Sequence, residues 1–201
     1  MELGKRIIQY LKRIIKFIKR NPIIKDFALF CLVTGLFHLL YWNTNMNAWL
    51  FGPYTEEVFR FFTLIAFKGT AFLSSIFFTS PFDAVDSSIK FYTLNALQEK
   101  EYYCIMQVVA DCSGIKQIFQ VFMIMLVLPN KLWKRMIYFL CSIFVVLFFN
   151  IIRIVSLTAV LLNHPQSYEC VHDWIGRPFH YIIIGLIWII FLQFFARPKK
   201  R

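Results

Sequence analysis

Residues 136–163, MIYFLCSIFVVLFFNIIRIVSLTAVLLN, form an almost unbroken apolar stretch that decides the fold. As a helix, this stretch is longer than the ~30 Å thickness of a membrane's hydrocarbon layer. Shorter apolar stretches that could also cross a membrane lie at 27–42, 115–128 and 179–195. The sequence therefore predicts an all-α membrane protein built as a bundle of about four transmembrane helices.

The composition agrees with this assignment, because 59% of the 201 residues are hydrophobic and 19% are aromatic. The net charge of +11 does not indicate nucleic-acid binding, because 15 of the 22 basic residues flank the apolar stretches. These 15 gather in an N-terminal arm, in a turn at 131–135 and in a tail at 197–201. Since cytoplasmic segments of membrane proteins are enriched in Lys and Arg, we expect both termini on the cytoplasmic side of the inner membrane.

Residues 1–26 are expected to be a cytoplasmic arm, and residues 27–201 a single membrane-embedded domain. Within the arm, residues 4–20 place apolar side chains on one helical face and cations on the other. Such a helix lies on an anionic leaflet, so anionic lipid is an expected partner. No cleavable signal peptide is expected, because no small-residue cleavage site follows the first apolar stretch.

Residues 58–78 resemble a span but carry Arg60, Lys68 and several hydroxyl groups. If they crossed, the acidic segment 81–111 would lie in the cytoplasm and the basic turn outside, which reverses the usual charge distribution. We therefore expect an amphipathic helix on the outer surface, with a true crossing as the alternative.

Two strand-like stretches follow, at 89–94 and 102–109, and the polar residues between them favour a turn. The sequence predicts a short hairpin here that leads directly into residues Asp111-Cys112-Ser113-Gly114. Ser113 and Gly114 are expected to start a helix, whose N-terminus stabilises negative charge such as that of a thiolate. Cys112 is therefore a candidate nucleophile.

Arg153 interrupts the long apolar stretch, and Asn150 lies one helical turn before it. An arginine facing lipid at this depth costs at least ~2 kcal/mol, so it is expected to face a polar interior or to snorkel to the interface. Asn150 is expected to brace it.

Among the histidines of the outer segments, His172 is the first choice for an acid or base. Asp173 follows it and could orient its ring, and Gly176 permits close approach to the next helix. His180, inside the last apolar stretch, is the alternative base.

Helical rise predicts that three of these residues lie at one depth. From the basic turn, about 26 Å of helix leads back to Cys112 and about 30 Å leads forward to Arg153. His172 lies just beyond the outer end of the last apolar stretch, also about 26 Å long. We expect the three side chains to meet at the outer face of the membrane.

The five cysteines show no metal-ligand spacing, so neither a metal nor a cofactor is expected. Cys104 and Cys170 both lie in outer segments, so a disulfide between them is an alternative to two free thiols.

Three motifs in this order resemble the exosortase/archaeosortase family, in its shorter branch. They are Cys112-Ser113-Gly114, the Asn150-to-Arg153 turn, and His172 with Gly176 four residues later. The resemblance covers residues 55–195. It implies a membrane cysteine protease or transpeptidase that processes C-terminal sorting signals near the outer leaflet. It also implies Cys112 as nucleophile, Arg153 as stabiliser of negative charge and His172 as general acid/base.

The substrates implied are membrane-anchored proteins that end in a short motif, one span and a basic tail. Hydrolysis and transfer both remain open, as does the oligomeric state. Two other functions are compatible with the sequence. One is a non-enzymatic membrane subunit of a machine for surface-polymer export or assembly, and the other is an enzyme acting on lipid phosphates through Arg177 and His180.

Overall fold

The computed structural model describes residues 22–44, 46–127 and 130–196. The amphipathic helix expected at 4–20 and the basic tail at 197–201 lie outside these residues, so both stay predictions. The chain divides into two compact units, Met1–Thr44 and Asn45–Arg201, which are described separately.

The first unit holds helix α2, Pro22–Asn43, which includes the predicted span at 27–42. Its last turn is closed by side chains that bond back into the helix, for example from Asn43 Nδ2 to the carbonyl of Leu39 at 2.8 Å. His38 accepts a hydrogen bond from the indole Nε1 of Trp42 at 3.0 Å. This histidine therefore has a local role on its own helix.

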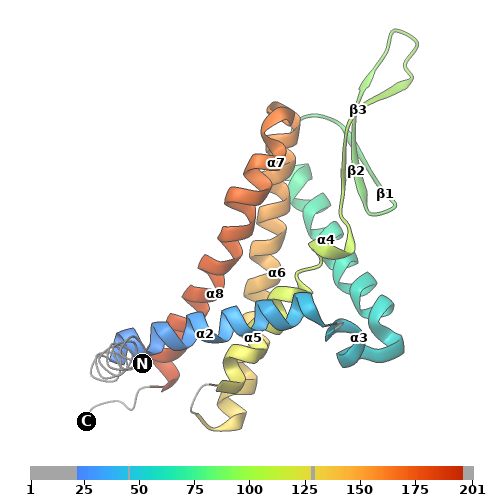
Figure 1. Ribbon diagram of the computed structural model, residues 1–201. Helices are drawn as coiled ribbons and strands as arrows, with labels where there is room; N and C mark the ends of the chain where they lie inside the picture. The colour runs from blue at the N-terminus through green and yellow to red at the C-terminus, as the bar shows by residue number, and fades with distance from the viewer. Residues whose placement is uncertain (1–21, 45, 128–129, 197–201) are drawn as a thin grey trace, which may run out of the picture. The chain divides into compact units, whose positions relative to one another are not determined.

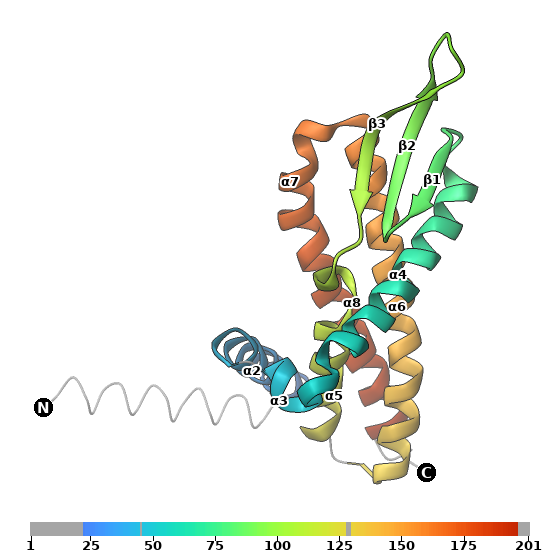
Figure 2. The same ribbon diagram turned by 90° about the vertical axis from the view of Figure 1, so that its right-hand side faces the viewer.

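The second unit contains the remaining helices and the sheet (Figures 1 and 2). Its elements are, in chain order, α3 (Met46–Phe51), η1 (Gly52–Tyr54), α4 (Thr55–Phe77), β1 (Phe82–Val85), β2 (Ser88–Leu94), β3 (Lys100–Gln107), η2 (Ala110–Cys112), α5 (Ile115–Val127), α6 (Leu132–Asn163), η3 (Pro165–Ser167), α7 (Tyr168–Val171), η4 (His172–Gly176), α8 (Arg177–Phe191) and η5 (Leu192–Ala196). Among the described residues the fold is thus mostly helical with one small sheet, as the sequence predicted.

Within the described part of the chain, four helical stretches are long and apolar enough to cross a membrane. Their bounds are Ile24–Asn43, Met46–Phe77, Leu132–Asn163 and Pro165–Phe194. The expected number of such helices is confirmed, but the set differs from the one predicted. Ile115–Val127 is shorter, at about 20 Å, and the stretch containing α4 meets the criteria by length and composition.

Helix α4 turns a stripe of small polar side chains toward the rest of its unit. Thr63, Thr70 and Ser74 are buried with Ala66 on this face, whereas Phe61, Phe72 and Phe77 on other faces are exposed. Figure 2 shows α4 crossing beside α6. Gly69 lies at this crossing, and a Cβ placed there would collide with the side chain of Ile151 on α6. The absence of a side chain at Gly69 therefore allows the two helices to approach closely.

The sheet has three antiparallel strands in the order β1-β2-β3, so the predicted two-stranded hairpin was incomplete. The missed strand β1 is only four residues long and is joined to β2 by a tight turn with positive φ at Asp86 and Ser87. The predicted turn after β2 is confirmed: Asn95 Oδ1 accepts hydrogen bonds from the backbone amides of Leu97 and Glu99, each at 2.9 Å. Local turn chemistry of this kind is visible in a sequence.

The sheet packs on the later part of α6 and on α4. Ile89, Phe91 and Met106 from the strands are buried against Ile154 and Leu157 of α6. Cys112 packs against the edge of this core. The core therefore holds the end of the strands, and the turn that follows them, at a fixed level along α6.

The earlier part of α6 packs instead on α5 and α8. The Tyr138 hydroxyl donates to the Ile187 carbonyl on α8 at 2.7 Å, and Arg135 donates to the Leu126 carbonyl at the end of α5 at 3.0 Å. These contacts join the helices where the basic turn connects α5 to α6.

Residues 168–178, which precede the last apolar stretch of the sequence, are helical and not a loop, because α7, η4, α8 and η5 form a continuous helical run from Tyr168 to Ala196. Pro178 has no N–H to donate and would usually break a helix. The wide π-helical turn of η4 immediately before it changes the local hydrogen-bond pattern and lets the run continue. His172 consequently lies on a helix.

Candidate functional site

Cys112 ends a short 3-10 turn between the sheet and α5. Its amide donates to the Val109 carbonyl at 2.8 Å, and the Ser113 amide donates to the Ala110 carbonyl at 3.0 Å. Helix α5 starts at Ile115, whose amide donates to the Ser113 hydroxyl at 3.4 Å. The predicted helix start thus lies one or two residues later than expected, and Cys112 remains partly accessible just before a helix N-terminus.

Asn150 fixes the backbone of Cys112 to α6. Its Nδ2 donates a 2.6 Å hydrogen bond to the Cys112 carbonyl oxygen, and its side chain is only 1% exposed. Gly114 has a φ of +80°, which L residues with a side chain adopt at a cost. A Cβ on Gly114 would also lie 3.4 Å from Asn150 Nδ2. The sequence expected Asn150 to brace Arg153; the structure shows it holding the cysteine.

Arg153 lies one turn after Asn150 on the same helix, partly buried. It is close enough to Cys112 and to Tyr168 for a coulombic interaction with each. A methyl group placed on Gly176 would lie 3.9 Å from Arg153 Cδ. This is an ordinary van der Waals distance, so Gly176 lies beside Arg153 but the close approach expected from the sequence does not require a glycine there.

His180 is the histidine in contact with Arg153. Its Nδ1 lies 3.3 Å from Nη1 of the arginine, and its side chain is 3% exposed. Arg153 Nε and His180 Nε2 are buried and have no hydrogen-bond partner among the described residues. The sequence had ranked His180 second to His172.

His172 lies two turns before His180 and is held by Asp173. Its Nδ1 is 2.8 Å from Asp173 Oδ1, and that oxygen also pairs with Arg177 at 3.3 Å. The His172 side chain is 29% exposed, so its other ring nitrogen can exchange protons with solvent or substrate. Arg177 is 65% exposed and forms an ion pair with Asp173, whereas His180 is buried. This difference does not favour a phosphate site shared by Arg177 and His180.

Tyr168 connects His172 to Cys112 and Arg153, and it was not predicted from the sequence. Its ring stacks on His172, with centroids 6.0 Å apart and planes at 19°. It interacts electrostatically with both Cys112 and Arg153, and its hydroxyl lies 4.0 Å from the sulfur of Met106 on β3. Once His172 is placed on a helix, the spacing of four residues would have put Tyr168 on the same face.

Asn150 thus holds the backbone of Cys112, while Arg153 contacts His180 and lies within coulombic range of Cys112 and Tyr168. Tyr168 in turn stacks on His172. A thiol beside a guanidinium, with an imidazole nearby, suits nucleophilic attack on a carbonyl group. Among the described residues no cluster of His, Cys, Asp and Glu side chains could hold a metal ion. Cys104 and Cys170 are free thiols, and burial raises the pKa of Cys104.

Comparisons with known proteins give one match. No curated protein matches the chain, and no solved structure matches it. A family model described as transmembrane exosortase matches residues 14–189, a region that contains all the candidate site residues. The family in general implies a cysteine transpeptidase of membranes. The chain therefore belongs to the transmembrane exosortase family.

Proposed function

We propose that this chain is a membrane-embedded cysteine protease or transpeptidase that processes the C-terminal sorting signals of exported proteins near the outer leaflet of the inner membrane. One observation carries the proposal. Cys112 is fixed to α6 by the Asn150 hydrogen bond and lies within coulombic range of Arg153, one turn further along that helix. A structural cysteine has no need of a cation in a bundle of apolar helices.

In the proposed reaction, His172 accepts the proton of the Cys112 thiol and the thiolate attacks a peptide carbonyl carbon. The new C–S bond gives a tetrahedral oxyanion, which the guanidinium of Arg153 stabilises. Collapse breaks the C–N bond, and His172 returns its proton to the leaving amine. A thioester to Cys112 remains.

The thioester is then released by an acceptor that carries an O–H or N–H group. His172 takes the proton of the acceptor, whose attack on the thioester carbonyl regenerates the thiolate. Water as acceptor gives hydrolysis, and an amine or hydroxyl gives transfer. The Asp173 carboxylate orients His172 through the 2.8 Å contact, and His180 is the alternative base.

The proposal gives His172 the proton transfers because it is far more accessible than His180, at 29% against 3% exposure. An acid/base that serves both a leaving group and an acceptor must reach both. His180, enclosed beside Arg153, is placed to hold the guanidinium in position.

The experiment that tests this proposal compares cells producing the native chain with cells producing Cys112→Ala. We expect exported proteins that end in a span and a basic tail to keep that segment, of roughly 20 residues plus the tail, only in the Cys112→Ala cells. Intact-mass measurement of these proteins shows the difference. Cys170→Ala, which removes another free thiol of the same region, is the matched control and should process normally.

Unchanged substrate masses in the Cys112→Ala cells would exclude the protease function and favour a non-enzymatic assembly subunit. If substrate masses are unchanged and the activity of the chain survives a thiol-alkylating reagent, an enzyme acting on lipid phosphates is favoured instead.

A further inference from the structure

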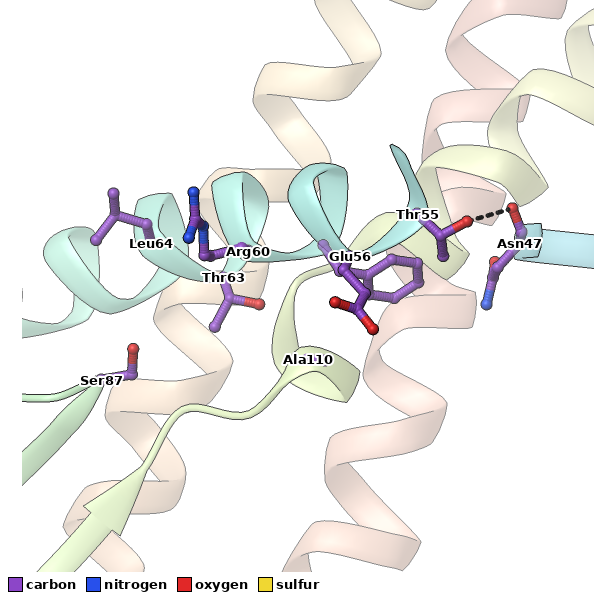
Figure 3. Close-up of a pocket in the computed structure, with 9 residues that line it drawn as sticks. Asn47, Thr55, Glu56, Arg60, Thr63, Leu64, Ser87 and Ala110 are labelled. Carbon is purple, nitrogen blue, oxygen red and sulfur yellow. Dashed lines mark hydrogen bonds between the residues drawn. The ribbon is translucent and has the colours of Figure 1, made fainter. Parts of the chain in front are cut away.

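A pocket of about 850 Å³ lies on the α4 side of the turn that carries Cys112. Its walls come from the first half of α4, from the β1–β2 turn at Ser87 and from η2 at Ala110 (Figure 3). Ala110 precedes Cys112 by two residues, so a molecule against Ala110 is within about 7 Å of chain from the cysteine. The site described above does not use this pocket.

Thr63 shows that the pocket has unfilled hydrogen-bonding capacity. Its side chain is 9% exposed, and its Oγ1 has no hydrogen-bond partner among the described residues. Figure 3 shows Thr63 and Glu56 on the side of α4 that faces the Ala110 turn. A buried hydroxyl without a partner is unfavourable, and a bound ligand that supplied the hydrogen bond would remove that cost.

Glu56 is the second polar group of the pocket. Arg60 lies one helical turn later, at a spacing that favours an ion pair, yet none joins the two among the described residues. The lining offers acceptors, chiefly the Glu56 carboxylate, beside donors in the Arg60 guanidinium, and the hydroxyls of Thr63 and Ser87 can do both. The N–H and C=O groups of an extended peptide's backbone amides match both kinds of group.

The dimensions also fit a peptide. Glu56 and Thr63 are seven residues apart on α4, or about 10 Å, which is the length of about three residues of extended chain. The volume lies within the range of ligand pockets in proteins. Phe59 and Leu64 supply apolar surface along the same wall.

We infer that this pocket binds the polar recognition segment of the substrate as an extended peptide, mainly through its backbone amides. Bound there, the segment would place a neighbouring peptide bond at Cys112. This inference rests on the proposed function and assigns Thr63 and Glu56 to substrate binding, not to the chemical step.

The test uses a photoreactive diazirine amino acid at position 64, in the full-length Cys112→Ala chain in its native membrane. Leu64 lines the pocket and is 43% exposed. The same amino acid at position 61 is the control, because Phe61 lies on the same helix, is 59% exposed and does not line the pocket. We expect position 64, and not 61, to crosslink the polar residues that precede the C-terminal span of exported proteins, as mapped by mass spectrometry.

Two substitutions sharpen the test. Thr63→Val and Glu56→Leu should each lower the position-64 crosslink at least fivefold. Thr70→Val and Glu57→Leu should not, because the Thr70 hydroxyl bonds to the Ala66 carbonyl at 2.7 Å and Glu57 does not line the pocket. A crosslink unaffected by Thr63→Val, equal from positions 61 and 64, or confined to lipid or to the substrate's span would overturn the inference.

Crosslinking needs no cleavage, so it separates this inference from the proposed function. If Cys112→Ala blocks processing but position 64 captures no recognition segment, the pocket assignment alone fails. If position 64 captures that segment but Cys112→Ala leaves substrate masses unchanged, the pocket assignment holds and the protease assignment fails.

Discussion

The two parts of α6 on either side of Asn150 have different surroundings. In the first part, residues 132–149, only Ser142 and Val146 are buried, and large side chains such as Phe144 and Phe148 are exposed at 74% and 55%. In the second part, residues 150–163, Asn150, Ile154, Val155, Leu157 and Thr158 are buried. The first part is the surface expected against lipid, and the second is the core of a small α/β layer.

Arg153 lies three residues past this boundary, which explains how the helix accommodates it. An arginine in the middle of the first part, away from the basic turn where Arg135 bonds to the end of α5, would face hydrocarbon at a cost of at least about 2 kcal/mol. On the second part it meets Cys112, Tyr168 and His180. Whether an apolar helix tolerates a charged side chain therefore depends on the residues that pack at the same level along that helix.

The largest effect is expected from removing the side chain of Arg153, which lies on the second part of α6. Arg153→Ala should lower the rate of sorting-signal processing about 10³-fold, because the oxyanion and thiolate lose their cation. Arg135→Ala is the control on the first part: it loses bonds to the end of α5 but should keep the rate within about threefold once chain levels are matched. Rates are measured by pulse-labelling an exported substrate. Equal losses in both variants would show that the arginines act on stability alone.

The next effect separates the two histidines of the last helical run. His172→Ala should lower the rate about 10²-fold or more, as expected for loss of a general acid/base. His180→Ala should lower it about tenfold, because Arg153 loses only a neighbour that positions it. Added imidazole should partly restore His172→Ala and not His180→Ala. The reverse pattern would move the acid/base role to His180.

A smaller effect is expected at Asn150, at the boundary itself. Asn150→Leu keeps the approximate volume but leaves the Cys112 carbonyl without its 2.6 Å donor, which should cost about 1–3 kcal/mol of stability and slow processing about tenfold. Ser142→Ala is the control on the first part, since its hydroxyl bonds only within its own helix, to the Tyr138 carbonyl. Thermal unfolding in detergent and the processing assay measure the two effects. If Asn150→Leu and Ser142→Ala lowered stability and processing to the same extent, the Asn150 hydrogen bond to Cys112 would have no special role.

The smallest effect concerns the sheet that packs on the second part. Hydrogen bonds from Lys100 and Tyr102 lower the pKa of Asp83 on the exposed face. A carboxylate with a lowered pKa stabilises the fold above its unfolded pKa, and this contribution is lost as the pH falls through the folded pKa. Asp83→Asn should therefore flatten the decrease of the unfolding temperature between about pH 5 and pH 3. An unchanged slope would mean that the contact contributes nothing measurable.

The sequence predicted well the features that depend on local chemistry. The apolar stretches and the Asn95 turn are visible because periodicity, hydrophobicity and turn preferences act within a few residues. The convergence of Cys112 on α6 was also expected, from helical rise and the charges that mark the ends of the stretches.

What the sequence could not supply depends on packing. Strand β1 is short and needs β2 to exist, and the continuation of the last helix through Pro178 depends on the π-helical turn before it. Tyr168 was missed because its position follows only from that continuous helix. The contact of His180 with Arg153 depends on the rotation of α8 against α6, which no local pattern encodes.

The missing side chain at Gly69 has a consequence for where a substrate is cut. It lets α4 lie directly against Ile151, which is next to Asn150, the residue that holds the Cys112 carbonyl, so the helix that carries the pocket and the turn that carries the thiol both contact the same part of α6. A peptide held in that pocket would meet the sulfur at a set number of residues from its docking point. The number of residues between the recognition segment and the cut would then be constant. Moving the recognition segment by one residue in a substrate should therefore move the cut by one residue.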